Sequence, residues 1–255
     1  MVILKRYITM KRSPKLSVVI PTLNEEHTLP ILLERLLEIL RQGDEIIVVD
    51  GGSSDRTVSI ARQFNVCVLH SPKTGRAAQL DFGARSARSD YLCFLHSDTS
   101  TPDKLAELIH HTLSNEKVVL GGFVSIMRGK ETRWLISFLN YSKTYLAPLF
   151  YKPYAFFFKG LRLLFGDQVM FCRRSDYLKS GGFNTETMIM EEAELCLCMN
   201  KLGRIQQVHR LVYSSDRRVA QLGLWKAIKI YLYVAMGWVF GFSSKELSAR
   251  YEHIR

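Results

Sequence analysis

The chain has 255 residues, of which 47% are hydrophobic and 23% are charged. This balance excludes a disordered chain, and the length suits one large α/β domain or two small ones. Its 35 lysines and arginines outnumber 24 acids and give a formal charge of +11, which favours anionic partners such as phosphates, nucleic acid or acidic lipid headgroups.

The N-terminal residues 1–15 carry five basic side chains and no acid. We predict a basic arm here, which either lies in solvent or contacts anionic lipid. No apolar stretch of signal-peptide length follows the arm, so we expect a cytoplasmic protein. The five cysteines contain no CxxC pair, which agrees with reduced thiols in that compartment.

Strand and helix patterns then alternate along the first half of the chain. Short apolar, β-branched runs predict strands at 16–20, 45–49, 66–69, 91–95 and 117–127. Helical spacing of apolar residues predicts helices between them, at 25–40, 57–64, 76–88 and 103–113. Such nearly all-apolar strands joined by helices predict an α/β fold with a mainly parallel sheet covered by helices on both faces.

Polar segments follow four of these strands, at 21–26, 50–55, 71–76 and 96–98. Ligands of a parallel sheet bind at the carboxyl ends of its strands, so we expect these segments to form one site. Asp50 would accept hydrogen bonds from a nucleobase, or it only holds a turn. Asp98 would hold a divalent cation with His96 beside it on the same strand face, or the pair is an ordinary strand end.

The common phosphate-binding signatures are missing from these loops. No GxGxxG follows the first strand, which disfavours a dinucleotide-binding Rossmann domain. No GxxxxGK[ST] is present either, which disfavours a P-loop NTPase.

Three acids, Glu191, Glu192 and Glu194, begin a later predicted helix. The helix dipole favours acids in a first turn, but a carboxylate facing a cleft would also serve as a general base. Residues of a helix are about 100° apart, so we expect Glu192 to face the cleft and Glu191 and Glu194 to share another face. Adjacent carboxylates would also separate their pKa values.

Taken in order, the motifs resemble glycosyltransferase family 2 with the GT-A fold of nucleotide-diphospho-sugar transferases. The resemblance extends over residues 16–215 and is similar to a small bacterial subgroup associated with radical-SAM proteins. It is carried by the segments 18–25, 48–57, 94–98, 166–168, 181–183 and 190–192.

The resemblance implies a role for each matching residue. On the donor side, Pro21, Thr22 and Glu25 would hold the nucleoside, Asp50 the base, and Arg76 the base or a phosphate. Asp98 would bind a divalent cation, Mg²⁺ or Mn²⁺, with His96 as a candidate second ligand. Glu192 would be the catalytic base, with Glu191 as the alternative, and the residues on the acceptor or sugar side would be Asp167, Gln168 and Gly182.

The implied activity is an inverting transfer of a sugar from a UDP- or GDP-sugar to an acceptor hydroxyl, with a lipid among the candidate acceptors and no nucleic-acid partner. Oligomerisation stays open. Three positions, Gly51, His96 and Glu192, differ from the residues usual in the family. A nucleotide-sugar-binding protein with altered catalysis is therefore one alternative, and a nucleotidyltransferase on a similar fold is another.

The last segment, 216–255, is predicted to form a C-terminal helical extension around an apolar run at 230–242. This run is shorter than the ~20 residues that a spanning helix needs. It would pack on the sheet, form a dimer seam, or lie in a membrane interface. With the basic arm and an aromatic, basic stretch at 145–165, it favours a peripheral location on the inner face of the cell membrane.

Overall fold

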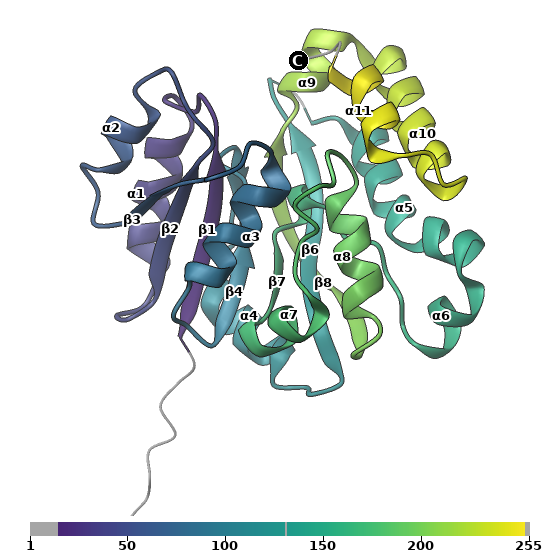
Figure 1. The fold of residues 1–255 in the computed structure, drawn as a ribbon, viewed down its shortest axis with the longest axis horizontal. Coiled ribbons are helices and arrows are strands. Elements are labelled where there is room, and N and C mark those ends of the chain that lie inside the picture. The colour runs from purple at the N-terminus through teal and green to yellow at the C-terminus, as the bar shows by residue number, and fades with distance from the viewer. Residues whose placement is uncertain (1–14, 131, 253–255) are drawn as a thin grey trace, which may run out of the picture.

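The computed structural model describes residues 15–130 and 132–252, so the predicted arm lies, except for Lys15, outside the described residues. Within them, an eight-stranded sheet has the order β3-β2-β1-β4-β7-β6-β8-β5. Figure 1 shows this sheet with helices packed around it. Its strands are β1 (Leu16–Thr22), β2 (Glu45–Asp50), β3 (Cys67–His70), β4 (Tyr91–Phe94), β5 (Thr99–Ser100), β6 (Val118–Arg128), β7 (Met170–Arg173) and β8 (Arg204–Ser215).

The sheet is mixed and mostly parallel. Strands β3, β2, β1 and β4 pair in parallel, as the sequence predicted. Strand β7 then pairs antiparallel with both β4 and β6, while β8 is parallel to β6 and antiparallel to β5. The sequence pattern predicted neither β7 nor β8, because β7 is only four residues long and β8 is mostly polar, unlike the apolar runs from which the strands were predicted.

Helices cover both faces of the sheet, which confirms that part of the prediction. They are α1 (Leu29–Ile39), α2 (Thr57–Ala61), α3 (Arg76–Ser86), α4 (Leu105–Leu113), α5 (Trp134–Tyr151), α6 (Pro153–Phe158), α7 (Arg174–Ser180), α8 (Glu191–Met199), α9 (Arg217–Leu222), α10 (Leu224–Val239) and α11 (Ser244–Glu252). Successive side chains of β1 point to opposite faces. Val19 packs with α3 and α8, whereas Val18 and Ile20 pack with α1 and α4.

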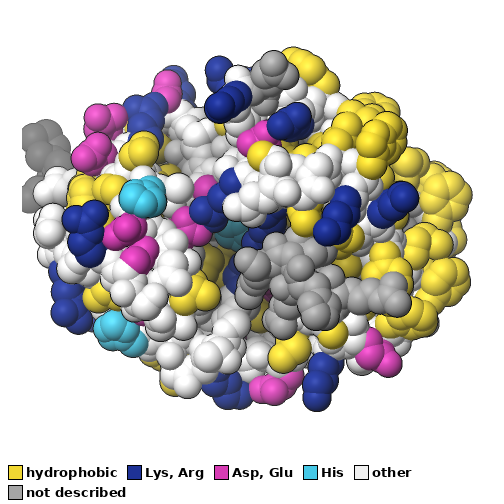
Figure 2. Space-filling model, turned by 90° about the horizontal axis from the view of Figure 1, so that it is seen from above, with side chains coloured by type: hydrophobic (Ala, Val, Ile, Leu, Met, Phe, Trp, Pro, Cys, Tyr) yellow, Lys and Arg dark blue, Asp and Glu magenta, His cyan; other side chains and the backbone are white. Residues whose placement is uncertain are grey.

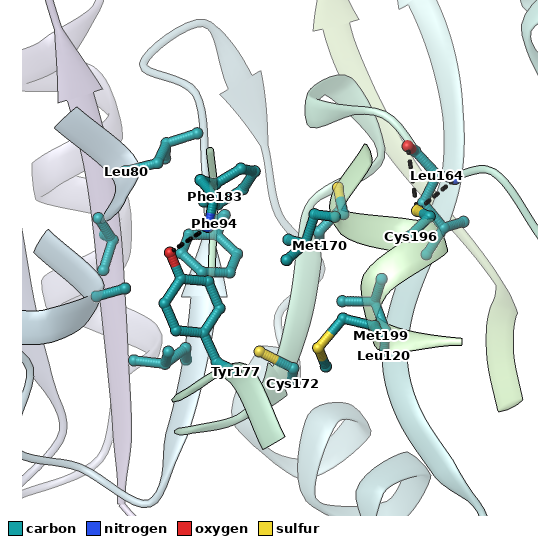
Figure 3. Packing of buried hydrophobic residues seen from close by; sticks show 14 of the residues in the cluster. Leu80, Phe94, Leu120, Leu164, Met170, Cys172, Tyr177, Phe183, Cys196 and Met199 are labelled. Carbon is teal, nitrogen blue, oxygen red and sulfur yellow. Dashed lines mark hydrogen bonds between the residues drawn. The ribbon is translucent and has the colours of Figure 1, made fainter. Parts of the chain in front are cut away.

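The core between β4, α3, α7 and α8 is drawn in Figure 3, where Tyr177 lies against Phe94 and Phe183. The Tyr177 hydroxyl donates to Asp81 at 2.8 Å and accepts from the Phe183 backbone N–H at 3.0 Å. A Cβ on Gly182 would come within 2.8 Å of this hydroxyl, and its φ of +77° also suits glycine. Gly182 therefore permits a tight turn over a buried tyrosine.

Helices α5, α6, α10 and α11 gather at the end of the molecule opposite α1 and α2 (Figure 1). The rings of Tyr151 and Trp238 lie 5.2 Å apart and join α5 to α10. The single apolar C-terminal helix that we expected is not what the described residues form. The segment is divided into α9, α10 and α11, because Gly223 and Gly241 take positive φ values, and α10 carries Lys226 and Lys229 on its exposed side.

No helix within the described ranges combines the length and the apolar character that crossing a bilayer requires.

Candidate active site

The carboxyl ends of β1 and β2 form the floor of the site. Pro21 lies on β1 opposite Val49, and the Thr22 side chain is buried beside it. The Gln79 amide of α3 donates to both the Thr22 and the Val49 carbonyl oxygens at 2.8 Å. These two hydrogen bonds from Gln79 hold the ends of β1 and β2 together. Gln79 was not among the residues predicted from the sequence, where its signal is a lone amide on the apolar side of a helix.

Asp50 is buried at the end of β2 and binds its own loop. Its Oδ2 accepts the backbone N–H groups of Gly52 at 2.9 Å and Ser53 at 3.1 Å, and lies 3.5 Å from Nδ1 of His70. Gly52 has a φ of +99°. Asp50 therefore holds the turn, which was the simpler of its two predicted roles, and its contact to a base stays a prediction.

Glu25 and Asp98, predicted on separate loops, are joined by a third residue, Arg217. Arg217 reaches from the start of α9 to both Glu25 oxygens, with Nη1–Oε2 at 3.0 Å and Nη2–Oε1 at 2.5 Å. Its Nη2 also lies 3.3 Å from Asp98 Oδ2. Burial alone would raise the pKa of Glu25, but the hydrogen bonds from Arg217 and Thr28 outweigh it and lower that pKa.

Asp98 is half-buried, and burial raises its pKa although the charge of Arg217 opposes the rise. Within the described ranges, no three His, Cys, Asp or Glu residues group as metal ligands would. Mg²⁺ and similar ions are often held by one or two carboxylates together with substrate phosphates. Asp98 fits that sparse arrangement, in which phosphate oxygens supply most of the ligands.

His96 lies close to Gly166 and Glu192, and its predicted role as a second metal ligand beside Asp98 stays a prediction. Strand β4 already ends at Phe94, so both residues lie in the following loop. A Cβ on Gly166 would lie 2.4 Å from Nε2 of His96 and 2.8 Å from Oε1 of Glu192. That Nε2 atom is buried and lacks a hydrogen-bond partner in the part of the chain that the structure describes.

Arg76, at the start of α3, connects to both acids that open α8. Its Nε lies 2.6 Å from Glu191 Oε1, and its Nη2 lies 3.1 Å from Glu192 Oε1. Glu191 and Glu192 are both buried, so the expectation that they face apart was wrong. The helix begins at Glu191 directly after Met190 in the left-handed conformation, and the planar guanidinium is wide enough to meet both neighbours. The Arg76 guanidinium is thus paired with two carboxylates in this structure.

Glu194 lies apart from this pair and accepts a hydrogen bond from the Thr187 hydroxyl at 2.6 Å. Burial raises the pKa of Glu192 to about 7, the nearby Arg76 opposes this rise, and Glu191 and Asp167 add to it. A general base works best when its pKa lies near the operating pH, so Glu192 has the protonation behaviour of one.

The other wall of the site comes from α5. The amide of Asn140 donates to Asp167, and Nζ of Lys143 lies 3.7 Å from the centre of the Phe165 ring. Burial lowers the pKa of Lys143, while the charges of Asp167 and Glu192 act to raise it. Asn140 and Lys143 were not among the residues predicted from the sequence, where their signal is two polar residues three apart within an aromatic segment.

Gln168 and Gly182 lie outside this group. The Gln168 side chain is buried, with Nε2 donating to the Thr144 hydroxyl at 3.0 Å and Oε1 accepting the Phe165 N–H at 3.1 Å. It therefore holds the turn that presents Asp167. The contacts of Gly182 are with Asp81 and Tyr177, in the core described above. Both residues support the site by packing, and their predicted contact with sugar or acceptor stays a prediction.

The fold and the loops together define a class of protein: an α/β domain with an acidic and cationic site at the carboxyl ends of parallel strands. The chain belongs to glycosyltransferase family 2, since the model of that family, "Glycosyl transferase family 2", matches residues 17–181.

Among curated proteins, it is 32% identical over 146 residues to "Probable glycosyltransferase YdaM" of Bacillus subtilis, which covers 51% of this chain and 34% of that protein. It is 33% identical over 114 residues to an undecaprenyl-phosphate 4-deoxy-4-formamido-L-arabinose transferase of Pectobacterium carotovorum, covering 40% of this chain and 35% of that protein. The matches thus span about a third of these relatives' length.

Solved structures show the same fold. Glucosyl-3-phosphoglycerate synthase of Mycobacterium tuberculosis, in complex with Mn²⁺, UDP and glucosyl-3-phosphoglycerate, superposes with a TM-score of 0.62 at 21% identity, covering 88% of this chain and 80% of that one. A mannosyltransferase of Pyrobaculum calidifontis in complex with GDP-Man and Mn²⁺ gives 0.65 at 18% identity, covering 90% and 64%. The fold is therefore that of GT-A transferases.

Proposed function

We propose that this protein is an inverting glycosyltransferase that moves a sugar from a nucleotide-sugar to an acceptor hydroxyl, with Glu192 as the base. The observation that carries the proposal is the buried Glu192 carboxylate, whose pKa is raised to about 7, at the strand edge that also presents Asp98. Family membership agrees with this chemistry.

The proposed step follows from the position of that carboxylate. Glu192 accepts the proton of the acceptor hydroxyl while the hydroxyl oxygen forms a bond to the anomeric carbon. The bond from that carbon to the diphosphate oxygen breaks, and its electron pair leaves with the nucleoside diphosphate. Attack opposite the leaving group inverts the anomeric centre. Positioned general-base catalysis is worth about 10²–10⁴-fold in rate.

The donor occupies the loops that follow β1, β2 and β4. Pro21, Thr22 and Asp50 would contact the nucleoside, and Asp98 would hold Mg²⁺ or Mn²⁺ against the diphosphate. When bound, such an ion supplies positive charge to the leaving phosphates. The solved relatives with UDP and Mn²⁺ and with GDP-Man and Mn²⁺ support this choice of donor and ion.

The acceptor side is the wall formed by Asp167, Asn140 and Lys143. One curated relative is named for an undecaprenyl-phosphate substrate, which supports a lipid acceptor here. The radical-SAM-associated subgroup is part of the same proposal and rests on the sequence resemblance at 166–168 and 190–192.

Helix α5 supports an acceptor that is presented from a membrane, because its buried face and its exposed face differ in character. Residues 136, 140, 144 and 148 are buried, while residues 134, 138, 146 and 150 are exposed. The two sets are offset by two positions, which places them about 200° apart around the helix. The buried face bears Asn140 beside Asp167, and the exposed face is apolar. One helix thus joins the acceptor wall to an outer apolar surface.

This surface, the aromatic face, is large. Figure 2 shows hydrophobic side chains gathered at the end that α5, α6, α10 and α11 occupy, with basic side chains near its edge. Exposed lysines accompany it at positions 152, 159, 226 and 229. Aromatic and basic groups together suit the interface of an anionic membrane, so we propose a peripheral location on the cytoplasmic face. The aromatic face consists of Trp134, Phe138, Phe150, Tyr154, Phe157, Phe158 and Trp225, each at least 64% exposed.

The experiment that tests the function is a screen of nucleotide-sugars with the pure protein and Mn²⁺. We expect one UDP- or GDP-sugar to raise the melting temperature, because a ligand that binds the folded state stabilises it by mass action. The same sugar should be hydrolysed slowly or transferred. Stabilisation without any turnover would favour the alternative of a nucleotide-sugar-binding protein, and turnover of a nucleoside triphosphate would favour a nucleotidyltransferase.

A further inference from the structure

Arg217 connects three parts of the chain at the donor side of the site. It begins α9, it holds both oxygens of Glu25 in the loop after β1, and it approaches Asp98 in the loop after β4. The residue before it, Asp216, binds Nε of Arg133 at 2.7 Å next to α5. A Cβ on Gly129 would overlap the Asp216 carboxylate, so glycine is needed there for this side chain to enter. The position of Arg217 is therefore built from several elements.

Two arginines of the site lie against its acids. Arg217 pairs with Glu25 and has its Nη2 3.3 Å from Asp98 Oδ2, while Arg76 pairs with Glu191 and Glu192. The guanidinium of Arg217 thus lies against the carboxylate that would hold a metal ion at the donor diphosphate. A positive charge held at this position would meet the same phosphate oxygens as that ion.

Guanidinium groups bind phosphate oxygens well, because their N–H groups form a planar fork with two parallel hydrogen bonds. Glu25 already orients the fork of Arg217 through both of its oxygens. The Nη2–Oδ2 distance of 3.3 Å to Asp98 is longer than the two contacts with Glu25. The contact to Asp98 is accordingly the weaker one, and the one that a phosphate oxygen would replace.

We propose that Arg217 binds the diphosphate of the nucleotide-sugar and stabilises it as the leaving group, sharing with the divalent ion the neutralisation of its charge, while Glu25 acts as the positioning residue of Arg217. This inference rests on the proposed glycosyltransferase function. It gives Glu25 a role different from the nucleoside contact that the family resemblance implies.

Titration calorimetry of UDP and GDP with the full chain tests the proposal, once with Mn²⁺ and once with EDTA. We expect the nucleotide that binds in Mn²⁺ to bind measurably in EDTA as well. Arg217→Gln should weaken binding in both conditions by about 10- to 100-fold, the range expected for a hydrogen bond to a charged group. Arg217→Lys keeps the charge but lacks the planar guanidinium fork. Its affinity for the nucleotide should lie between those of wild type and Arg217→Gln.

The matched control is Arg210→Gln, which removes the same charge from an exposed position on β8. It should leave both affinities unchanged. Equal or tighter binding by Arg217→Gln would overturn the proposal, because Arg217 would then only compete for Asp98. If Arg217→Gln does not fold, binding by Arg217→Lys equal to that of wild type overturns it. Absence of any nucleotide binding in Mn²⁺ would instead contradict the proposed function itself.

Discussion

Gly166 lies between His96 and Glu192 with no room for a methyl group, since an added Cβ would lie 2.4 Å from the imidazole and 2.8 Å from the carboxylate. Atoms at such distances must move apart. Gly166, which precedes Asp167 in the sequence, therefore determines how closely the His96 imidazole and the Glu192 carboxylate approach each other.

Gly166→Ala should reduce transfer by at least about 10-fold, because displacement of a catalytic group by about 1 Å can cost ~10²-fold in rate. UDP or GDP affinity should change little, since Gly166 lies on the acceptor side of Glu192. Kinetic constants and calorimetry of the variant check this. The matched control is Gly52→Ala. An added Cβ at Gly52 would meet no atom within 4 Å, but the φ of +99° is unfavourable for alanine. This variant should therefore disturb the loop of Asp50 rather than the surroundings of Glu192.

Glu192→Gln should keep donor binding and lose transfer by at least about 100-fold, because the amide cannot accept the acceptor proton. Glu194→Gln is the control, since Glu194 bonds Thr187 away from Arg76. It should retain most activity. Glu191→Gln tests the neighbouring acid, and if this variant is inactive while Glu192→Gln remains active, the base is Glu191.

The pH dependence of transfer should follow the ionisation of Glu192. The pKa of this group is raised to about 7, so its carboxylate, the form that accepts a proton, becomes the main species only above that pH. We expect kcat/KM to rise with pH and to level off above about 7. A profile already flat at pH 5 in wild type would contradict the assignment.

The same ionisation has an effect on stability with a defined sign. Because the folded-state pKa of Glu192 lies above its ordinary value of 4.5, the folded protein holds this proton more tightly than the unfolded chain does. The stabilisation is complete below about pH 4.5 and is lost as pH rises through about 7. Glu192→Gln should therefore raise the melting temperature relative to wild type more at pH 8 than at pH 5, as a pair of thermal melts would show.

Asp98→Asn should remove the Mn²⁺ dependence of nucleotide binding while the fold survives, because the amide has the size of the carboxylate without its charge. Calorimetry of UDP and GDP with and without Mn²⁺ measures this. The control, Asp103→Asn, removes the same charge from an exposed residue that pairs with Arg35. An unchanged Mn²⁺ effect in Asp98→Asn would exclude the carboxylate from the metal site.

Binding to anionic vesicles should depend on the aromatic face and should weaken as salt rises, since exposed charges are screened. Sedimentation with phosphatidylglycerol vesicles should show loss of binding for Trp134→Ser combined with Phe150→Ser. The control is Ile31→Ser, at an equally exposed apolar position on α1 at the other end of the molecule. A concentration-dependent dimer without vesicle binding would instead assign the aromatic face to a second copy of the chain.

Local pattern was enough to predict the parallel half of the sheet and the loops at its carboxyl edge. Runs such as 45–49 are apolar throughout because β2 is covered on both sides. The local sequence pattern did not predict which site residues contact one another. Arg217 is 192 residues from Glu25 along the chain, and nothing in the spacing of either residue shows that they meet.

The interpretation of single residues failed where a backbone detail decided their direction. Periodicity assigned Glu191 and Glu192 to different faces, but the left-handed Met190 starts the helix so that Arg76 meets both. The side-chain hydrogen bonds of Gln168 were likewise not predicted from the sequence. Such outcomes depend on main-chain dihedral angles and tertiary contacts, which residue types alone do not determine.

The arrangement of α5 also sets a limit on the length of a lipid acceptor. An α-helix with its side chains is about 10–12 Å across, and α5 separates the acceptor wall from the aromatic face by that thickness. If the aromatic face rests on the bilayer, a reactive hydroxyl placed directly on the membrane surface would fall short of Glu192 by about one helix diameter. Acceptors that carry a headgroup or spacer of at least this reach should therefore be used, and simple long-chain alcohols should not.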